Sequence, residues 1–220
     1  MKPISYKCIY KEEAVNTWTH GIGMVSALVG CAFLGISAFK TQNGWIIFSI
    51  LIYCLSMMSS YISSTFYHGS SNPFHKHFLR KFDHSAIFLF IAGSYTPFTL
   101  ITLRNEGAWG WTLFGIVWGA AIIGIILSFL KMKKSSNLKT ICYLAMGWVV
   151  VIAFKPLLHV LQSNNSMNVL YWLIGGGLFY TVGSVFFFLD KYKYMHPLWH
   201  IFVMGGTACH FWAIYLLTRL

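Results

Sequence analysis

The sequence predicts an all-α integral membrane protein, a seven-transmembrane helix bundle with its N-terminus in the cytoplasm and its C-terminus outside. Hydrophobic residues make up 57% of the chain and charged residues only 10%, which is too apolar for a water-soluble domain. A bilayer-spanning helix needs about 20 residues, and seven such helices fit into the 220 residues with little left over. No linker is long enough to separate two domains, so residues 1–220 are expected to form one membrane domain.

Seven apolar runs define the expected spans. In chain order they lie at approximately 20–39, 45–67, 82–103, 108–130, 138–160, 168–189 and 197–217. Polar or turn-forming residues separate them, at 42–44, 69–73, 104–107, 131–137, 162–166 and 190–193. The first run follows a polar segment, and no small-residue cleavage site follows it, so we expect a retained span. Lys155 and Pro156 interrupt the fifth run and predict a kink or an early exit there.

The distribution of basic residues predicts the orientation. Basic loops resist translocation and stay in the cytoplasm. Twelve of the sixteen Lys and Arg residues fall on one side of the predicted topology: Lys2, Lys7, Lys11, Lys76, Arg80, Lys81, Lys131, Lys133, Lys134, Lys139, Lys191 and Lys193. The other side holds only Lys40, Arg104, Lys155 and Arg219. The N-terminus is therefore expected inside the cell.

Charge and cysteine content exclude several other classes. The formal net charge of +11 comes from short clusters between apolar runs, which is typical of topology signals and contacts to anionic headgroups rather than of a nucleic-acid-binding face. The five cysteines show no CxxC spacing, so neither a disulfide framework nor a thiolate metal site is indicated. A Gly-rich stretch at 175–177, with Gly183, Gly205 and Gly206, favours close helix packing over a phosphate loop, because no strand precedes it.

Four polar residues at the ends of apolar runs form the candidate site. His68 ends the second run, Asp83 opens the third, and His196 and His200 open the seventh, so all four are expected at the cytoplasmic side. Residues four apart share a helix face, which pairs His196 with His200 and Ser64 with His68. Three imidazoles with an open fourth position are the ligand set of catalytic zinc, which turns water into a nucleophile near neutral pH.

The carboxylate of Asp83 has two possible roles in such a site. It either ligates the metal directly or accepts a proton from the attacking water, while Ser64 orients the water or a substrate oxygen. Pro197 disfavours helical geometry at the residue before it and makes His196 a cap or first-turn residue. The alternative is that each of these residues is a solvated or capping group at a helix end.

The other histidines are not expected to bind the metal. His20 also begins a span on the cytoplasmic side, where it is either a partner that contacts a metal ligand or a helix-end residue. His84 faces about 100 degrees away from Asp83 on a helix. His75 and His77 are expected to be exposed, and His159 and His210 lie toward the opposite side. Tryptophans at the run ends match the aromatic belts of membrane proteins: Trp18, Trp45, Trp109, Trp111 and Trp172.

Five segments together resemble the haemolysin III family over nearly the whole chain. They are residues 16–21 (NTWTHG), 64–68 (STFYH), 81–85 (KFDHS), 92–98 (AGSYTPF) and 196–200 (HPLWH). This family resembles the progestin and adipoQ receptors and, more distantly, the alkaline ceramidases. The resemblance implies a seven-helix bundle that binds Zn²⁺ near the cytoplasmic leaflet through His68, His196 and His200. Asp83 corresponds to the acid that contacts zinc directly or through water, and Ser64 to the nearby hydroxyl.

The resemblance also implies a function, because the related ceramidases hydrolyse a lipid amide. We therefore expect a zinc-dependent hydrolase whose partners are membrane lipids, with a ceramide-like or other acyl-amide lipid as substrate. A second possibility is a sensor of membrane state in which zinc is structural and no turnover occurs. A third, suggested by the family name, is a cytolytic pore former. A proton-coupled transporter is less consistent with ionisable groups gathered at one side.

Overall fold

The computed structural model describes residues 6–130 and 137–220, which contain helices and no strand. The helices are α1 (Tyr6–Lys40), α2 (Gly44–Gly69), α3 (Pro73–Pro97), α4 (Trp109–Phe129), α5 (Asn137–Trp148), α6 (Phe154–Ser163), α7 (Met167–Phe188) and α8 (Met195–Leu217). A π-helical segment, η1 (Phe98–Thr102), continues α3, and a 3₁₀ segment, η2 (Val149–Ala153), joins α5 to α6. When α3 is taken together with η1, and α5 with η2 and α6, the described residues form seven helical spans that are long and apolar enough to cross a membrane. This confirms the predicted fold class.

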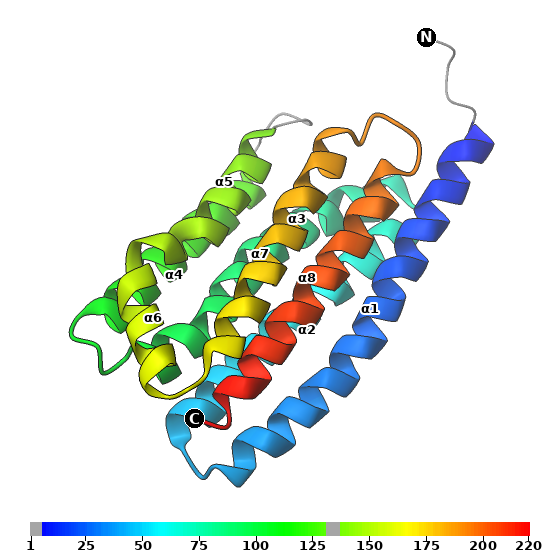
Figure 1. Ribbon diagram of the computed structural model, residues 1–220. Coiled ribbons are helices and arrows are strands. Elements are labelled where there is room, and N and C mark those ends of the chain that lie inside the picture. The colour runs from blue at the N-terminus through cyan, green and yellow to red at the C-terminus, as the bar shows by residue number, and fades with distance from the viewer. Residues whose placement is uncertain (1–5, 131–136) are drawn as a thin grey trace.

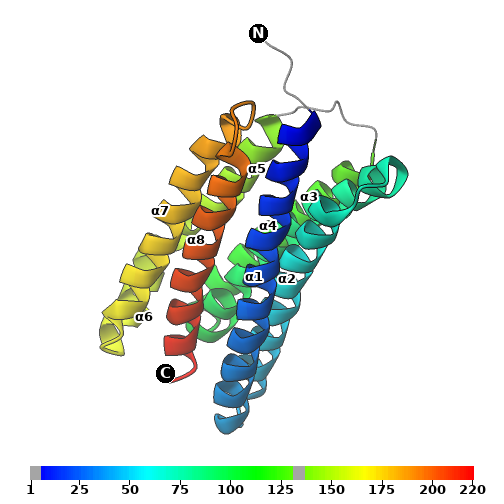
Figure 2. The same cartoon turned by 90° about the vertical axis from the view of Figure 1, so that its right-hand side faces the viewer.

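The helices run up and down the bundle, and the start of α1 and the end of α8 lie at opposite ends (Figure 1). Helix α1 packs between α2 and α8, α8 packs on α7, and α3 lies between α2 and α4 (Figure 2). Helix α3, together with η1, forms the most buried of the seven membrane spans. Of its most apolar stretch, 78% is buried inside the bundle. The start of α1, the α2–α3 junction and the α7–α8 junction lie together at one end, which we call the site end.

Seven of the basic residues that predicted the cytoplasmic side belong to segments at the site end: Lys11, Lys76, Arg80, Lys81, Lys139, Lys191 and Lys193. Lys2, Lys131, Lys133 and Lys134, and the side chain of Lys7, lie outside the described part of the chain. The orientation in the membrane stays a prediction, because it rests on charge alone.

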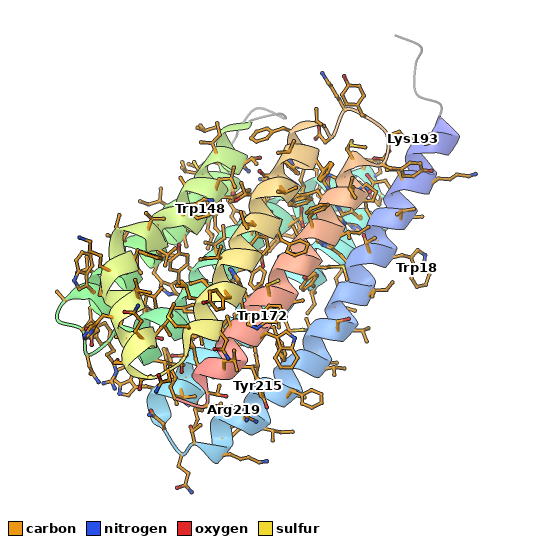
Figure 3. All side chains as sticks on the ribbon, in the orientation of Figure 1. Trp18, Trp148, Trp172, Lys193, Tyr215 and Arg219 are labelled. Atoms are coloured by element: carbon orange, nitrogen blue, oxygen red, sulfur yellow. The ribbon has the colours of Figure 1, made fainter. Side chains whose placement is uncertain are left out.

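The outer surface of the bundle is apolar, as expected of a surface that faces lipid. On α1 the exposed large side chains include Ile22, Val25, Leu28, Phe33 and Phe39. Trp18 points away from the bundle in Figure 3 and is 73% exposed. The other tryptophans predicted for the interfacial belts are also exposed: Trp45, Trp109, Trp111 and Trp172.

Helix α3 begins well before the third apolar run, at Pro73 rather than near residue 82. Asn72 caps it, because its side-chain oxygen accepts hydrogen bonds from the backbone N–H groups of Phe74 and His75. Pro73 at the first helical position adds a fixed φ that suits a helix start. The extra turns are polar, so hydropathy alone does not reveal them. His75 and His77 lie on these turns and are exposed, as expected.

The fifth run is broken where Lys155 and Pro156 predicted a break. Pro156 has no N–H to donate to the preceding turn, and the 3₁₀ segment η2 ends at Ala153, three residues before it. The Tyr95 side chain from α3 enters this break. Its hydroxyl donates to Gly147 O at 2.6 Å and accepts from Val150 N–H at 3.0 Å, so it replaces bonds that a continuous helix would make itself.

The glycines of α7 and α8 allow the two helices to approach closely. A Cβ at Gly176 would overlap the His210 ring, and one at Gly206 would lie 2.8 Å from the Tyr180 ring. Gly205 similarly leaves space for Phe179, at 2.7 Å from an added Cβ. These contacts agree with the packing role that the sequence predicted for the glycines.

Candidate metal centre

Three of the four predicted ligands meet at the site end. His68, on the last turn of α2, faces His196 and His200, on the first turns of α8. One ligand nitrogen of each lies within 4.8 Å of the other two. The ring centroids are 5.0 Å apart for His68 and His196, 5.2 Å for His68 and His200, and 4.8 Å for His196 and His200. We call these three residues the histidine triad.

The Nε2 atoms of the triad are buried and have no hydrogen-bond partner among the described residues. Buried polar atoms are normally paired, because an unpaired one loses its hydration without compensation. Three unpaired imidazole nitrogens in one cluster therefore fit a metal ion. Imidazole nitrogen is a usual ligand of zinc, with bonds of about 2.0–2.1 Å, and three such ligands leave a fourth position open. The residues present thus suit zinc in number and type.

A carboxylate fixes the His68 ring from the outside. His68 Nδ1 lies 2.7 Å from Oε2 of Glu13 on α1, and Lys76 Nζ lies 3.0 Å from the same oxygen. Because a carboxylate accepts hydrogen bonds, His68 donates through Nδ1–H, and this leaves the Nε2 lone pair free for a metal. Carboxylate–histidine pairs of this kind set the tautomer and the orientation of metal-binding imidazoles in many proteins.

The same helix fixes the His200 ring. Thr19 Oγ1 lies 3.0 Å from His200 Nδ1 and donates its own proton to the backbone carbonyls of Val15 and Asn16. Its lone pair therefore accepts from Nδ1–H of His200, and Nε2 is again free. His20, one residue later, stacks on His200 with ring centroids 3.5 Å apart. This contact agrees with the first of the two roles considered for His20, contact with a candidate metal ligand.

Pro197 is accommodated because His196 lies on the first turn of α8, as predicted. Helix α8 begins at Met195, where backbone N–H groups have no helical acceptor in any case. Tyr194, before the helix, has a φ of 65°, and its N–H donates to Oε1 of Glu12 at 3.1 Å. Adjacent residues of α1, Glu12 and Glu13, thus hold both helices that supply the triad.

Asp83 lies on α3 and is not part of the cluster of ligand nitrogens. Its carboxylate has Ser64 as a hydrogen-bonding neighbour and interacts electrostatically with His68. Ser64 is buried one turn before His68 on the same face of α2. The pair therefore adjoins the triad without entering it, and direct ligation of a metal by Asp83 stays a prediction.

A cavity of about 470 Å³ extends from the site end into the bundle. Asp83 and His20 line it near the triad, and Leu157 and Leu170 line it at the far end. Its walls come chiefly from α3, α5, α7 and α8 and consist mostly of aliphatic and aromatic side chains. A cavity of this size is in the range that binds a small ligand or an alkyl chain. The carboxylate of Asp83 and the imidazole of His20 therefore lie at the site end of a cavity whose walls are otherwise mostly apolar.

Sequence reasoning missed Glu13 and Thr19 as partners of the triad. The signal for Glu13 is a polar stripe on a helix that otherwise faces lipid, because Glu13, Asn16 and His20 are spaced to share one face of α1. Thr19 is not part of this stripe. Three other histidines lie away from the triad, as expected. His84 contacts Lys139, with 3.3 Å between Nδ1 and Nζ. His159 lies 3.6 Å from Glu106 at the opposite end, and His210 lies deep in the bundle.

Comparisons with known proteins show the family of the chain. The chain matches the family model for haemolysin-III related proteins over residues 8–211. It is 39% identical over 204 residues to hemolysin-3 of Bacillus cereus, which covers 93% of this chain and 90% of that protein. A hemolysin-3 homolog of Bacillus subtilis (strain 168) is 40% identical over 204 residues, with 93% of each chain covered.

A human protein is also similar along most of its length. Monocyte to macrophage differentiation factor from Homo sapiens is 33% identical over 218 residues, which covers 96% of this chain and 86% of that protein. It is a member of the progestin and adipoQ receptor family, in agreement with the superfamily expected from the motifs. The matched family model, the bacterial relatives and the seven-helix bundle together show that this chain belongs to the haemolysin III-related family of membrane proteins.

Proposed function

We propose that this protein is a zinc-dependent hydrolase of membrane lipids that acts on an acyl amide, with His68, His196 and His200 as the metal ligands. The observation that carries the proposal is the set of three buried, unpartnered Nε2 atoms beside Asp83 and His20, two residues that line an apolar cavity. Water reaches such a site from the membrane surface, and an acyl chain reaches it from within the bilayer. Relatives from Bacillus support a location in a bacterial plasma membrane.

Each side chain of the site has a separate task in this proposal. Zinc bound to the triad supplies Lewis-acid chemistry, which activates water and polarises the substrate carbonyl. Glu13 and Thr19 hold the His68 and His200 rings in the tautomer that leaves Nε2 free. Asp83 accepts a proton from the attacking water at its carboxylate and returns it to the amine that leaves when the C–N bond breaks. Ser64 orients the Asp83 carboxylate.

The cavity contributes binding rather than chemistry. Its mostly apolar wall buries the acyl chain and excludes bulk water from it. The carbonyl end of the acyl chain then lies at Asp83, where the cavity wall becomes polar. This division suits a lipid substrate whose reactive group adjoins its headgroup, as in ceramide-like and other acyl-amide lipids.

A second function is favoured by one feature of the packing. Helices α2 and α8, which carry the triad, pack mainly against α3, α1 and α7 rather than against each other. A metal ion in the triad would therefore connect two helices that have few other contacts. A structural zinc in a sensor of membrane state would have this effect and would need no turnover.

One experiment separates these functions. Zinc content and hydrolysis of a fluorescent acyl amide are measured on the purified protein in detergent, for the wild type and for His68→Ala and His200→Ala. His77→Ala, an exposed histidine at the same end, is the matched control. We expect zinc and hydrolysis to be lost together in the two triad variants only. Zinc without turnover on any lipid amide or ester would favour the sensor, and absence of zinc from the wild type would overturn both functions.

The cytolytic function suggested by the names of the Bacillus relatives needs a separate measurement. Leakage of ions from liposomes that contain the pure protein, unchanged by His68→Ala and His200→Ala, would favour pore formation over the hydrolase.

A further inference from the structure

Two cationic side chains from different helices meet at the site end. Arg80 lies on α3, and Lys139 lies on the first turn of α5. Lys139 Nζ lies 3.3 Å from Nδ1 of His84, and Tyr143 donates its hydroxyl proton to the carbonyl oxygen of His84 at 3.0 Å. Both contacts join the start of α5 to the turn of α3 that follows Arg80, since Arg80 and His84 are four residues apart and share a face. The guanidinium and the ammonium are therefore neighbours, and they interact electrostatically.

The two cations lie between the membrane surface and the polar end of the cavity wall. Asp83, three residues after Arg80, lines the cavity, and so does Tyr143, four residues after Lys139. These spacings put each cation on the same helix face as its lining residue. Because α3 and α5 both begin at the site end (Figure 1), each cation is about one helical turn, or roughly 5 Å, nearer the surface. A lipid whose chain fills the cavity thus presents its headgroup to Arg80 and Lys139.

The charges around this pair do not balance among the described residues. Asp83 interacts electrostatically with Lys139 and supplies one negative charge against two positive charges. Glu13, another carboxylate of the site end, contacts His68 and Lys76 instead. Both cations are half-buried, so their mutual repulsion is screened less than between groups in open water. A ligand with more than one negative charge, such as a phosphate monoester, would neutralise the pair.

Other lysines of the site end differ from this pair in their surroundings. Lys81 Nζ lies 3.4 Å from the carbonyl oxygen of Phe129, at the end of α4. Lys191 is exposed and lies over the ring of Tyr192, at 5.1 Å from its centroid. A topology signal that stays in the cytoplasm accounts for such positions. Among the described basic residues of the site end, Arg80 and Lys139 are the two that share a helix face with residues of the cavity wall.

We propose that Arg80 and Lys139 bind the phosphate of the lipid whose acyl chain occupies the cavity, so that the protein prefers an acyl-amide lipid with a phosphorylated headgroup. A guanidinium can donate two parallel hydrogen bonds to phosphate oxygens, and an ammonium adds further donors and a second charge. A phosphate a few bonds from a carbonyl held at Asp83 spans about one helical turn, roughly 5 Å, which is the offset of the two cations. The inference rests on the proposed function in placing the acyl chain in the cavity and its carbonyl at Asp83, and it adds the class of headgroup.

Binding of N-oleoylethanolamine and of its phosphate monoester tests the inference, because the two lipids differ only by the phosphate. Equilibrium binding of the radiolabelled lipids is measured on the immobilised full chain in a nonionic detergent. Binding is chosen over turnover because Lys139 also interacts with Asp83, which turnover would report. We expect the wild type to bind the phosphate ester about tenfold more tightly, the ratio that corresponds to one hydrogen bond to a charged group. Arg80→Gln and Lys139→Gln should each lose most of this preference and still bind the unphosphorylated amide.

Two further variants separate the charge from the fold. Lys139→Arg keeps the positive charge and should keep the preference. Lys191→Gln removes an exposed lysine at the same end and should also keep it. On the wild type, added salt should reduce the preference without any mutation, because half-exposed charges are screened.

Inorganic phosphate distinguishes a lipid headgroup from a free anion. It should displace the phosphate ester only at concentrations far above those of the ester, because it lacks the chain that the cavity binds. Displacement at equal concentrations would make the ligand a free anion and would overturn the inference.

Three other results would overturn the inference: equal affinities of the wild type for the two lipids, a preference kept by both Gln variants, or a preference unaffected by salt. Equal affinities in a protein that holds zinc and hydrolyses the unphosphorylated amide would leave the proposed function intact. A phosphate preference that depends on Arg80 and Lys139, in a protein without zinc or turnover, would overturn the hydrolase alone.

Discussion

His68 Nδ1 lies 2.7 Å from Oε2 of Glu13, although 55 residues separate them in the chain. The contact joins the polar start of α1 to the end of α2 and fixes which nitrogen of His68 faces the triad. Lys76, on the first turns of α3, forms an ion pair with Glu13, with 3.0 Å between its Nζ and the same carboxylate oxygen. Three helices therefore set the orientation of one candidate ligand.

Replacing Glu13 with Gln should weaken zinc binding without abolishing it. The variant removes the charge that favours Nδ1–H on His68, and loss of such a partner typically lowers metal affinity by about 10–100-fold. Competition with a chelator measures the affinity. Glu106→Gln is the control, because Glu106 lies beside His159 at the far end. Unchanged affinity in Glu13→Gln, with a clear loss in His68→Ala, would show that the carboxylate does not orient the ligand.

Replacing Asp83 with Asn should abolish turnover and leave zinc bound. The amide keeps the shape of the side chain but cannot accept the proton, and a general base typically contributes about 10²–10⁴ in rate. Steady-state hydrolysis and zinc content are measured on the same preparation. A variant that loses zinc as well would make Asp83 a direct ligand. Ser64→Ala should reduce the rate by less, because Ser64 acts on the carboxylate and not on the substrate.

The sequence predicted the three histidines that meet at the site end, but it did not predict the residues that orient them. His196 and His200 share a face through their spacing alone, and the topology placed His68 and Asp83 at the same end. The residues that orient them, Glu13 and Thr19, lie on α1. No local sequence pattern indicates which other helices α1 packs against. That choice depends on tertiary contacts between α1, α2 and α8.

The number of membrane spans was predictable from the sequence, whereas the contacts between distant segments were not. Hydropathy gave seven spans, because bilayer thickness sets helix length, and Pro156 marked the break in the fifth. The Tyr95 hydroxyl that enters this break comes from α3, about fifty residues earlier in the chain. The polar first turns of α3 were missed for another reason: their signals are the Asn72 cap and Pro73, which hydropathy does not register.

Replacing Tyr95 with Phe should destabilise the bundle. The hydroxyl bonds to both Gly147 O and Val150 N–H at the break between α5 and α6. Its removal leaves two backbone groups unpaired, which we expect to cost about 1 kcal/mol, since hydrogen bonds inside membrane proteins are worth about this much. Thermal unfolding in detergent measures the change. The exposed Tyr171→Phe is the control, and equal unfolding temperatures for both variants would contradict the role of Tyr95.

Replacing Gly176 with Ala should separate α7 from α8. The added methyl group would overlap the His210 ring, which has little freedom to move because Tyr180 lies against it and Leu173 O holds Nε2. Overpacking of this kind typically costs about 1–3 kcal/mol. Gly115→Ala on α4 is the control, because an added Cβ there meets no atom within 4 Å. Thermal unfolding should show a lower midpoint for Gly176→Ala alone, and an equal effect of both variants would mean that the close approach of α7 and α8 does not limit the residue at this position.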